Sequence, residues 1–282
     1  MKPDPALILR RKIINRLMTS LFIVATTIAV GALVVILGKL LITGASELSP
    51  RIFIMNTPAP GAKGGLLNAI FGSVAMTLVA IVTVTPIAVL AGTYLAEYGR
   101  GSRLGHVVRF LNDTLLSAPS IIIGLFIYGV IVLRAGHFSG WAGAASLALI
   151  ALPVIVRTTE DMMRLIPDSL REAAVALGCP YWRMVVSIGW RSARPGIMTG
   201  ILLAVARISG ETAPLLFTAL NNQFFTTNMN GPMSSLPVVI FQFAMSPYRD
   251  WQSLAWAGAL LITASVLFLN VTARAIVSRG SR

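Results

Sequence analysis

The sequence predicts an all-α integral membrane protein with six transmembrane helices. Of its 282 residues, 56% are hydrophobic and only 12% are charged. Its mean hydropathy of +0.80 leaves too little polar surface for a water-soluble fold. Several uncharged runs reach the roughly 20 residues that a helix needs to cross a hydrocarbon core of about 30 Å. We therefore expect a single transmembrane domain over 17–276, with a basic tail at 1–16 and a short tail at 277–282.

Each expected span coincides with an uncharged or nearly uncharged run of residues. The first run comes after a basic stretch, but it is longer than the roughly 7 to 15 residues of a signal-peptide core, so we interpret it as a retained anchor. Between the last two spans, residues 236–245 are apolar but too short to cross, which predicts a re-entrant or interfacial helix. The expected spans cover about 17–42, 66–96, 114–134, 142–158, 195–220 and 251–274.

The positions of Lys and Arg predict the orientation. Seventeen of the 23 basic residues fall on the side that holds both ends of the chain, five fall on the other side, and Arg207 lies inside a span. Both termini are therefore expected in the cytoplasm, and the net charge of +13 needs no nucleic-acid partner. The 17 residues are Lys2, Arg10, Arg11, Lys12, Arg16, Arg100, Arg103, Arg109, Arg157, Arg164, Arg171, Arg183, Arg191, Arg194, Arg274, Arg279 and Arg282.

A polar loop at 159–194 separates the fourth and fifth spans and contains a short predicted helix. Ser169 and Glu172 fit a capping box, and Gly178 followed by Pro180 fits a C-terminal stop, so the helix is expected to have about eight residues. Helical spacing gives it one shallow apolar stripe, which suits either a docking partner or the bilayer surface. The stripe consists of Leu170, Ala173, Ala174 and Leu177.

Arg207 and Glu211 are charges inside the fifth expected span. Arg207 lies 12 residues beyond Pro195, roughly 18 Å along a helix and near the bilayer midplane. An arginine there costs at least about 2.5 to 3.5 kcal/mol, so it should face protein or water. Two interpretations stay open. Arg207 and Glu211 form an internal i,i+4 salt bridge, or Glu211 holds Arg207 in an anion site, for which a guanidinium is well suited.

Arg157 and Glu160 form a second candidate pair at the inner end of the fourth span. The spacing also allows ordinary helix-end salt bridges, from Arg157 to Asp161 and from Glu160 to Arg164. The sequence does not decide between such bridges and a role in a transport pathway.

The sequence contains no recognisable catalytic or metal-binding pattern. Cys179 is the only cysteine, which excludes an intrachain disulfide and a cysteine-based metal site. His106 and His137 lie in loops expected on opposite sides of the membrane. We therefore expect no catalytic residue, no cofactor and no metal.

The polar loop resembles the EAA signature of the inner-membrane permeases of ABC importers. Glu172, Ala173, Ala174, Gly178 and Ile188 match that signature at its spacing, although Trp190 and Arg191 stand where it usually has Leu and Pro. The resemblance implies a type I, MetI-like permease fold with a cytoplasmic coupling helix that sits in a cleft of a separate ATPase. The coupling residues that it implies are Leu170, Arg171, Glu172, Ala173, Ala174, Leu177 and Gly178.

Longer stretches are similar to one branch of this family, the phosphate-specific transport permeases. They lie at 93–99, 117–129, 152–178 and 206–220, and GETAP at 210–214 with LPVVIFQFA at 236–244 favours the A-type permeases over the companion C-type. Matched residue by residue, the intramembrane charges of the branch imply four substrate-binding residues. These are Arg157, Glu160, Arg207 and Glu211.

The resemblance implies a permease subunit that moves inorganic phosphate across the cytoplasmic membrane, while a separate subunit hydrolyses ATP. It also implies three kinds of partner: a C-type permease, two copies of a cytoplasmic ATPase and an extracytoplasmic phosphate-binding protein. One alternative is a permease half for another oxyanion such as molybdate, tungstate or sulfate. An ion-coupled secondary transporter is a second alternative, although no repeat of spans is visible. A membrane scaffold would leave the buried charges unexplained.

Overall fold

A computed structural model of the chain describes residues 5–280, and all the regular secondary structure within this range is helical. The predicted all-α architecture is therefore confirmed. Five helices are long: α1 (Pro5–Glu47), α2 (Leu67–Glu97), α6 (Gly140–Arg164), α9 (Trp190–Ile208) and α12 (Arg249–Gly280).

Short helices and turns connect the long ones. The α-helices are α3 (Arg103–Ser117), α4 (Ser120–Ile127), α5 (Leu133–Ala135), α7 (Asp168–Ala176), α8 (Tyr181–Met184), α10 (Ala213–Thr218) and α11 (Leu236–Ala244). A 3-10 turn, η1, covers Pro50–Phe53, and two π-helical turns, η2 and η3, cover Tyr128–Val132 and Val185–Gly189.

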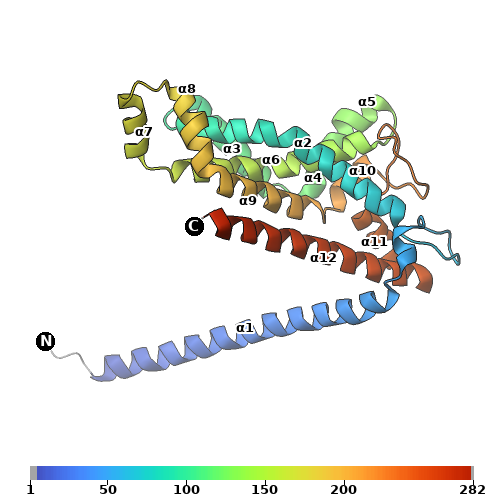
Figure 1. Ribbon diagram of the computed structural model, residues 1–282. Coiled ribbons are helices and arrows are strands. Elements are labelled where there is room, and N and C mark those ends of the chain that lie inside the picture. Colours follow the sequence, from blue (N-terminus) through green and yellow to red (C-terminus); the bar gives the residue numbers. More distant parts are fainter. Residues whose placement is uncertain (1–4, 281–282) are drawn as a thin grey trace.

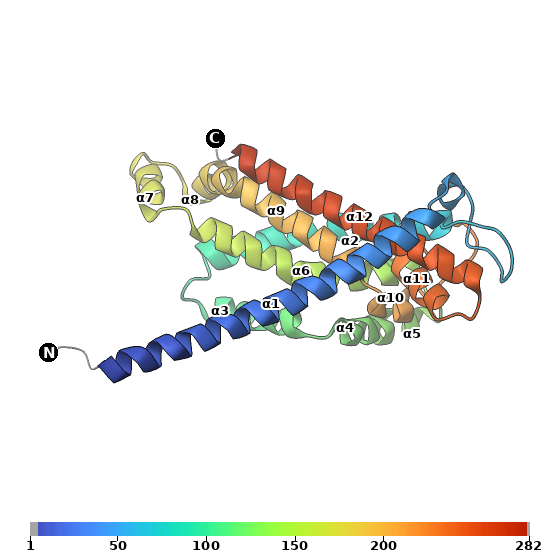
Figure 2. The same cartoon turned by 90° about the horizontal axis from the view of Figure 1, so that it is seen from below.

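The long helices give the molecule two distinct ends (Figure 1). The start of α1 and the end of α12 lie at the same end as α7 and α8, whereas α5, α10 and α11 lie at the opposite end. The perpendicular view agrees (Figure 2). We call the end with α7 the inner end. Lys2 and Arg282, which the orientation argument used, lie outside the described residues.

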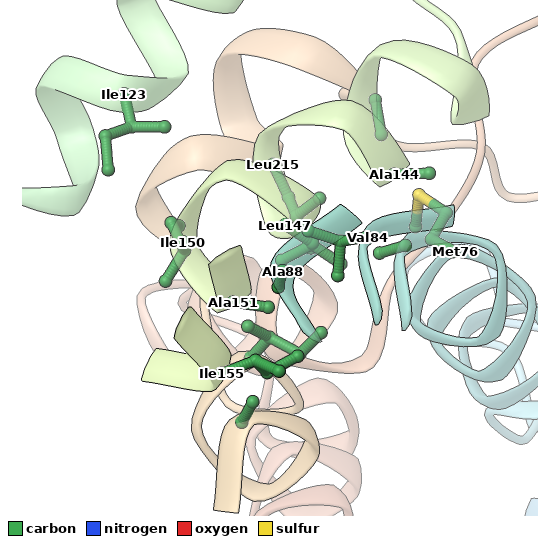
Figure 3. Packing of buried hydrophobic residues seen from close by; sticks show 14 of the residues in the cluster. Met76, Val84, Ala88, Ile123, Ala144, Leu147, Ile150, Ala151, Ile155 and Leu215 are labelled. Atoms are coloured by element: carbon green, nitrogen blue, oxygen red, sulfur yellow. The ribbon is translucent and has the colours of Figure 1, made fainter. Parts of the chain in front are cut away.

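The packing of α2 along α6 forms the centre of the core (Figure 3). Met76, Ala80, Val84 and Ala88 recur at every fourth position of α2 and are almost fully buried, because this spacing places them on one helix face. Gly92 continues the same face. A Cβ there would lie only 2.7 Å from the Cβ of Thr159, so the two backbones approach closely at this point. The α6 side of the core consists of Ala144, Leu147, Ile150, Ala151 and Ile155.

α9 runs antiparallel to α6 and packs against a different face of it. Gly200 lies against Thr158, and Gly196 lies against Met162, where in both places a Cβ would collide with the side chain. These two contacts set the register of the pair: a residue of α9 that is further along the chain faces an earlier residue of α6.

α1 is exposed along most of its length and diverges from the other helices toward its start (Figures 1 and 2). Its 43 residues span roughly 64 Å. It meets α12 near its C-terminal end, where a Cβ on Gly44 would lie 2.8 Å from the Cβ of Leu260. A helix that is apolar all round is typical of a membrane span.

Within the described residues, four helices are long and apolar enough to cross a membrane, or five if the bent run from α3 to α5 counts as one span. The four are α1, α2, α6 and α12, which correspond to the first, second, fourth and sixth predicted spans. The third and fifth predicted spans differ from the structure.

The third predicted span, 114–134, is not one straight helix. The chain bends by 108° between α3 and α4. Pro119 disfavours the helical conformation at the residue before it, and Ala118 is accordingly extended, with ψ of 134°. The straight helix expected across this point is therefore wrong.

The fifth predicted span, 195–220, is shifted and interrupted. The helical run begins earlier, at Tyr181, and continues through α8, η3 and α9 to Ile208. Residues 209–212 are not helical, and the short helix α10 follows them. Gly210 lies in this break and Pro214 lies in the first turn of α10, and both residue types disfavour a continuous helix.

Candidate coupling loop and anion-binding residues

α7 is the short helix predicted in the polar loop, and its C-terminus is as expected. Gly178 has φ of +77°, so it occupies the left-handed conformation that ends helices. The amide of Cys179 donates to the carbonyl of Ala174, 3.1 Å away, as in a helix C-cap. The N-terminus differs from the prediction. No side chain caps α7, which begins at Asp168, directly after Pro167, so the capping box is wrong.

The predicted coupling residues divide into two faces of α7. Leu170, Glu172, Ala173 and Leu177 are exposed, and Leu177 is 89% exposed. Arg171 and Ala174 are instead buried, at 8% and 7% exposure. The exposed residues are therefore available to a partner, whereas the other two attach α7 to the rest of the chain.

Arg171 joins the ends of α2 and α6 to α7. Its guanidinium donates to both carboxylate oxygens of Glu97, at 2.8 and 3.2 Å, and to Asp168, at 2.7 Å. It also donates to the backbone carbonyls of Met163, at 2.8 Å, and Ile166, at 2.6 Å. Met163 lies in the last turn of α6 and Ile166 lies just beyond its end, so the guanidinium binds carbonyls where the helix stops. One side chain therefore holds together three elements of the inner end.

Burial and neighbouring charges shift the pKa of Arg171 in opposite directions. Burial disfavours the charged guanidinium, but the hydrogen bonds and charges of Glu97 and Asp168 outweigh it, so the pKa of Arg171 lies above its ordinary value. The hydroxyl of Tyr181 also donates to Glu97, at 2.7 Å. Burial and this hydrogen bond raise the pKa of Tyr181 to about 12. Both groups therefore keep a fixed charge state near neutral pH.

Glu160 lies at the centre of a second charge cluster, which α6 shares with α3. Its side chain is 3% exposed, and its carboxylate binds Arg109, at 2.8 Å, and Arg164. Arg109 also donates to the carbonyl of Leu95 on α2, at 2.7 Å. The predicted pair from Glu160 to Arg164 is therefore present. In this conformation the carboxylate of Glu160 binds two arginines of its own chain.

Arg157 and Glu160, the candidate pair of the sequence analysis, form no ion pair with each other in the described structure. Its guanidinium binds Asp161, at 3.2 Å, which is the alternative that the i,i+4 spacing offered, and Asp113 of α3 lies 3.8 Å away. Half of its side-chain surface is exposed, as is about half of that of Asp161. Exposed pairs of this kind contribute little to stability, at most about 1 kcal/mol.

Arg207 and Glu211 form no ion pair in the described part of the chain. The i,i+4 bridge requires a continuous helix, but α9 ends at Ile208 and Glu211 lies in the non-helical break. Arg207 is exposed, and no acceptor among the described residues binds its guanidinium. The interpretation as an internal salt bridge is therefore wrong for this conformation.

Arg157 and Arg207 both lie beside the contact of α6 with α9. Arg157 precedes Thr158, and Arg207 follows Gly200 by seven residues, nearly two turns, so it points to almost the same side of α9 as Gly200. The register of the pair places Arg207 level with Ala151, six residues or roughly 9 Å along α6 from Arg157. The structure thus places two of the four predicted anion-binding residues on neighbouring helices, each with an exposed side chain.

Sequence reasoning missed two residues that organise these clusters. Glu97, the partner of Arg171, lies 74 residues before it, and Arg109, the partner of Glu160, lies 51 residues before it. Neither pair has a sequence signal. A carboxylate at the end of a long apolar run, as in Glu97, was the one available indication of a buried partner.

Comparison with known proteins agrees with this architecture. Residues 85–282 match the family described as binding-protein-dependent transport system inner membrane component. The phosphate transport system permease protein PstA of Pasteurella multocida is 58% identical over 96% of this chain and 97% of its own length. The protein of the same name from Haemophilus influenzae is 57% identical over 94% of both chains. PstA 1 of Mycobacterium tuberculosis is 35% identical over 96% of this chain and 90% of its own length.

Solved structures show the same fold. A chain of the MetNI methionine ABC transporter in an inward-facing conformation superposes with a TM-score of 0.66 at 20% identity, over 77% of this chain and 96% of that chain. A chain of a bacterial alginate ABC transporter, solved with an alginate-bound periplasmic protein, gives a TM-score of 0.64 at 11% identity, over 95% and 98%. The predicted permease fold of ABC importers is thus confirmed. The chain belongs to the family of binding-protein-dependent transport system inner membrane components, in the branch of the PstA phosphate transport permeases.

Proposed function

We propose that this chain is a transmembrane permease subunit of an ATP-driven importer that moves inorganic phosphate across the cytoplasmic membrane. Its relatives with the highest identity reported above are named phosphate transport system permeases, and the similarity extends over nearly the whole of both chains. The chain itself performs no catalysis in this proposal. ATP is hydrolysed by a separate subunit, and α7 transmits the resulting movement.

The orientation follows from the basic residues and from the two ends of the molecule. The inner end contains both ends of the described chain, together with α7 and α8 (Figure 1). Most of the basic residues belong to the same end, which favours the cytoplasm. This arrangement supports the placement of both termini and α7 in the cytoplasm, with α10 and α11 toward the other side.

The expected partners are a second, C-type permease, two copies of a cytoplasmic ATPase and an extracytoplasmic phosphate-binding protein. The exposed face of α7, with Leu170, Ala173 and Leu177, supports the ATPase contact, because these apolar side chains are accessible to a partner. A binding protein is consistent with the family description. The side chains of Arg157 and Arg207 are exposed, so a second permease can approach them.

The observation that carries the phosphate pathway is Arg207. An arginine inside a predicted span, exposed and without a carboxylate partner among the described residues, is costly unless a ligand or water compensates it. A guanidinium binds phosphate oxygens through paired hydrogen bonds. Arg157, roughly 9 Å further along the α6–α9 pair, supplies the next cation toward the inner end. Glu160 and Glu211 belong to the same proposed site. Glu160 contributes indirectly, because its carboxylate binds two arginines of the chain.

Reconstitution tests this function directly. The chain with its C-type permease, ATPase and binding protein in lipid vesicles is expected to take up labelled phosphate only when ATP is present on the ATPase side. Molybdate, tungstate and sulfate in excess are expected to leave this uptake unchanged. Competition by one of these anions would identify it as the substrate instead, and uptake without the ATPase would indicate a secondary transporter.

A further inference from the structure

A groove of about 510 Å³ opens at the inner end between α2, η3 and α9. Its wall is apolar, with Val89 from α2 and Ile197 and Met198 from α9. Its inner edge carries Trp190, Arg191 and Arg194. Trp190 and Arg191 occupy the two places where the chain departs from the EAA signature, so the coupling function does not explain them.

The two arginines of this groove differ from five others at the inner end, which have a carboxylate partner. Arg100, Arg109, Arg157, Arg164 and Arg171 each bind a carboxylate. Arg191 and Arg194 are exposed, and the described part of the chain offers neither of them an ion pair or hydrogen bond. They are three residues apart on a helix, so they are neighbours on its surface. Two arginines without a carboxylate partner in the described chain therefore line this largely apolar groove.

The local backbone and Trp190 fix the position of this site. The π-helical turn Val185–Gly189 immediately precedes Trp190, and such turns are rare and often occur at functional sites. The indole of Trp190 donates to the hydroxyl of Thr93, 3.0 Å away, which attaches α9 to α2. Tryptophan is enriched at the membrane–water interface. Val89 lies one turn before Thr93, on the side of the bilayer core, so the groove runs from the interface into the hydrocarbon.

We propose that this groove binds an anionic phospholipid of the cytoplasmic leaflet. The two guanidinium groups hold the phosphodiester, because their planar forks match phosphate oxygens. One acyl chain lies along Val89, Ile197 and Met198. A free phosphate ion has the same headgroup chemistry but leaves the apolar wall uncovered, so the lipid fits the whole groove. The site goes beyond the transport function and uses from it only the orientation that places the inner end in the cytoplasm.

The test uses the assembled transporter in phosphatidylcholine vesicles. Two series of vesicles are compared, one with increasing dibrominated phosphatidylglycerol and one with increasing dibrominated phosphatidylcholine. Bromine quenches the fluorescence of nearby tryptophans. The chain has five tryptophans, so the signal of Trp190 is the difference between each protein and its Trp190→Phe counterpart. Each arginine near an anionic headgroup contributes about 1 kcal/mol. Brominated phosphatidylglycerol should therefore reach half-quenching at a mole fraction roughly tenfold to thirtyfold lower than brominated phosphatidylcholine does.

The double substitution Arg191→Gln with Arg194→Gln is expected to remove this preference. The matched control, Arg10→Gln with Arg11→Gln, removes the same charge from exposed positions of α1 and should retain it. A preference that survives the first double substitution overturns the proposal. So does loss of the Trp190 signal when excess inorganic phosphate is added, which would mean that the arginines bind the free ion.

Wild-type protein decides the question even if the double variant fails to assemble. Raising the salt should weaken the preference for phosphatidylglycerol, because the Debye length falls from about 10 Å at 0.1 M to about 3 Å at 1 M. An unchanged preference contradicts a headgroup site at these arginines. Phosphate uptake is measured in the same vesicles, so an error in the transport function appears there and an error in the lipid site appears in the quenching.

Discussion

The carboxylate of Glu97, at the end of α2, accepts two hydrogen bonds from the guanidinium of Arg171, in α7. Their side chains are only 2% and 9% exposed. A buried pair of this kind does not necessarily add net stability, but it fixes geometry, and removing one partner leaves an uncompensated charge. The pair therefore attaches α7 directly to α2, several of whose residues form the central core with α6.

The first prediction concerns this pair. Glu97→Gln and Arg171→Lys should each assemble in the membrane but lower phosphate uptake by about tenfold or more, and ATP hydrolysis should lose its dependence on substrate. Breaking a buried pair costs about 3 to 5 kcal/mol, and here it weakens the contact that attaches α7 to α2. Uptake and ATP hydrolysis by the reconstituted transporter provide the measurement.

A double-mutant cycle separates this role from a general loss of stability. Because Glu97 and Arg171 act through one contact, the double variant should be little worse than either single variant, so the coupling is about as large as the effect of one single variant. Arg183→Gln is the matched control, since Arg183 is exposed on the neighbouring helix α8. Purely additive effects would show that the two residues do not act together.

The second prediction concerns the left-handed residue after α7. A Cβ at Gly178 would meet no atom within 4 Å, so the effect of a substitution is expected from its φ of +77° rather than from a clash. Gly178→Val should therefore assemble yet lose transport and substrate-stimulated ATP hydrolysis. Gly178→Asn should retain much of both, because asparagine tolerates the left-handed conformation. Normal coupling in the valine variant would exclude α7 as the docking element.

The third prediction concerns topology. A reporter fused after Arg282 and one inserted near Arg103 should both be cytoplasmic, because most of the basic residues lie on that side. A reporter at Ala59, in the segment between α1 and α2, should be on the opposite side. A cytoplasmic signal from the Ala59 insertion would reverse the orientation proposed here.

Local signals in the sequence predicted most of the helices but not their breaks. Long uncharged runs correctly indicated α1, α2, α6 and α12, because span length depends on the bilayer and not on tertiary contacts. Gly178 was predicted correctly, since glycine followed by proline carries its own conformational preference. The bend at Pro119 and the break at Gly210 have sequence signals too, but the apolar residues on both sides of each also fit one continuous span.

The charge clusters depend on contacts that no local pattern contains. The spacing of Arg157 and Asp161 is a helix spacing, and that pair is present. Glu97 and Arg171 meet only because α2, α6 and α7 end together, which requires the whole fold. For Arg207 and Glu211, a local pattern predicted a pair that the described structure does not contain. Their spacing suggests a pair, but the spacing has this meaning only inside a continuous helix.

The last prediction concerns the role of Arg207. Because Arg207 and Glu211 form no ion pair in the described structure, removing both does more than cancel two paired charges. The double change Arg207→Met with Glu211→Gln should assemble but fail to transport phosphate. Arg207→Lys keeps the charge and loses the planar fork, so uptake should fall steeply without vanishing if paired hydrogen bonds hold the anion. Arg183→Gln again serves as the control for loss of one exposed positive charge. Labelled-phosphate uptake at matched membrane abundance is the measurement, and a wild-type rate in the double variant would remove Arg207 from the pathway.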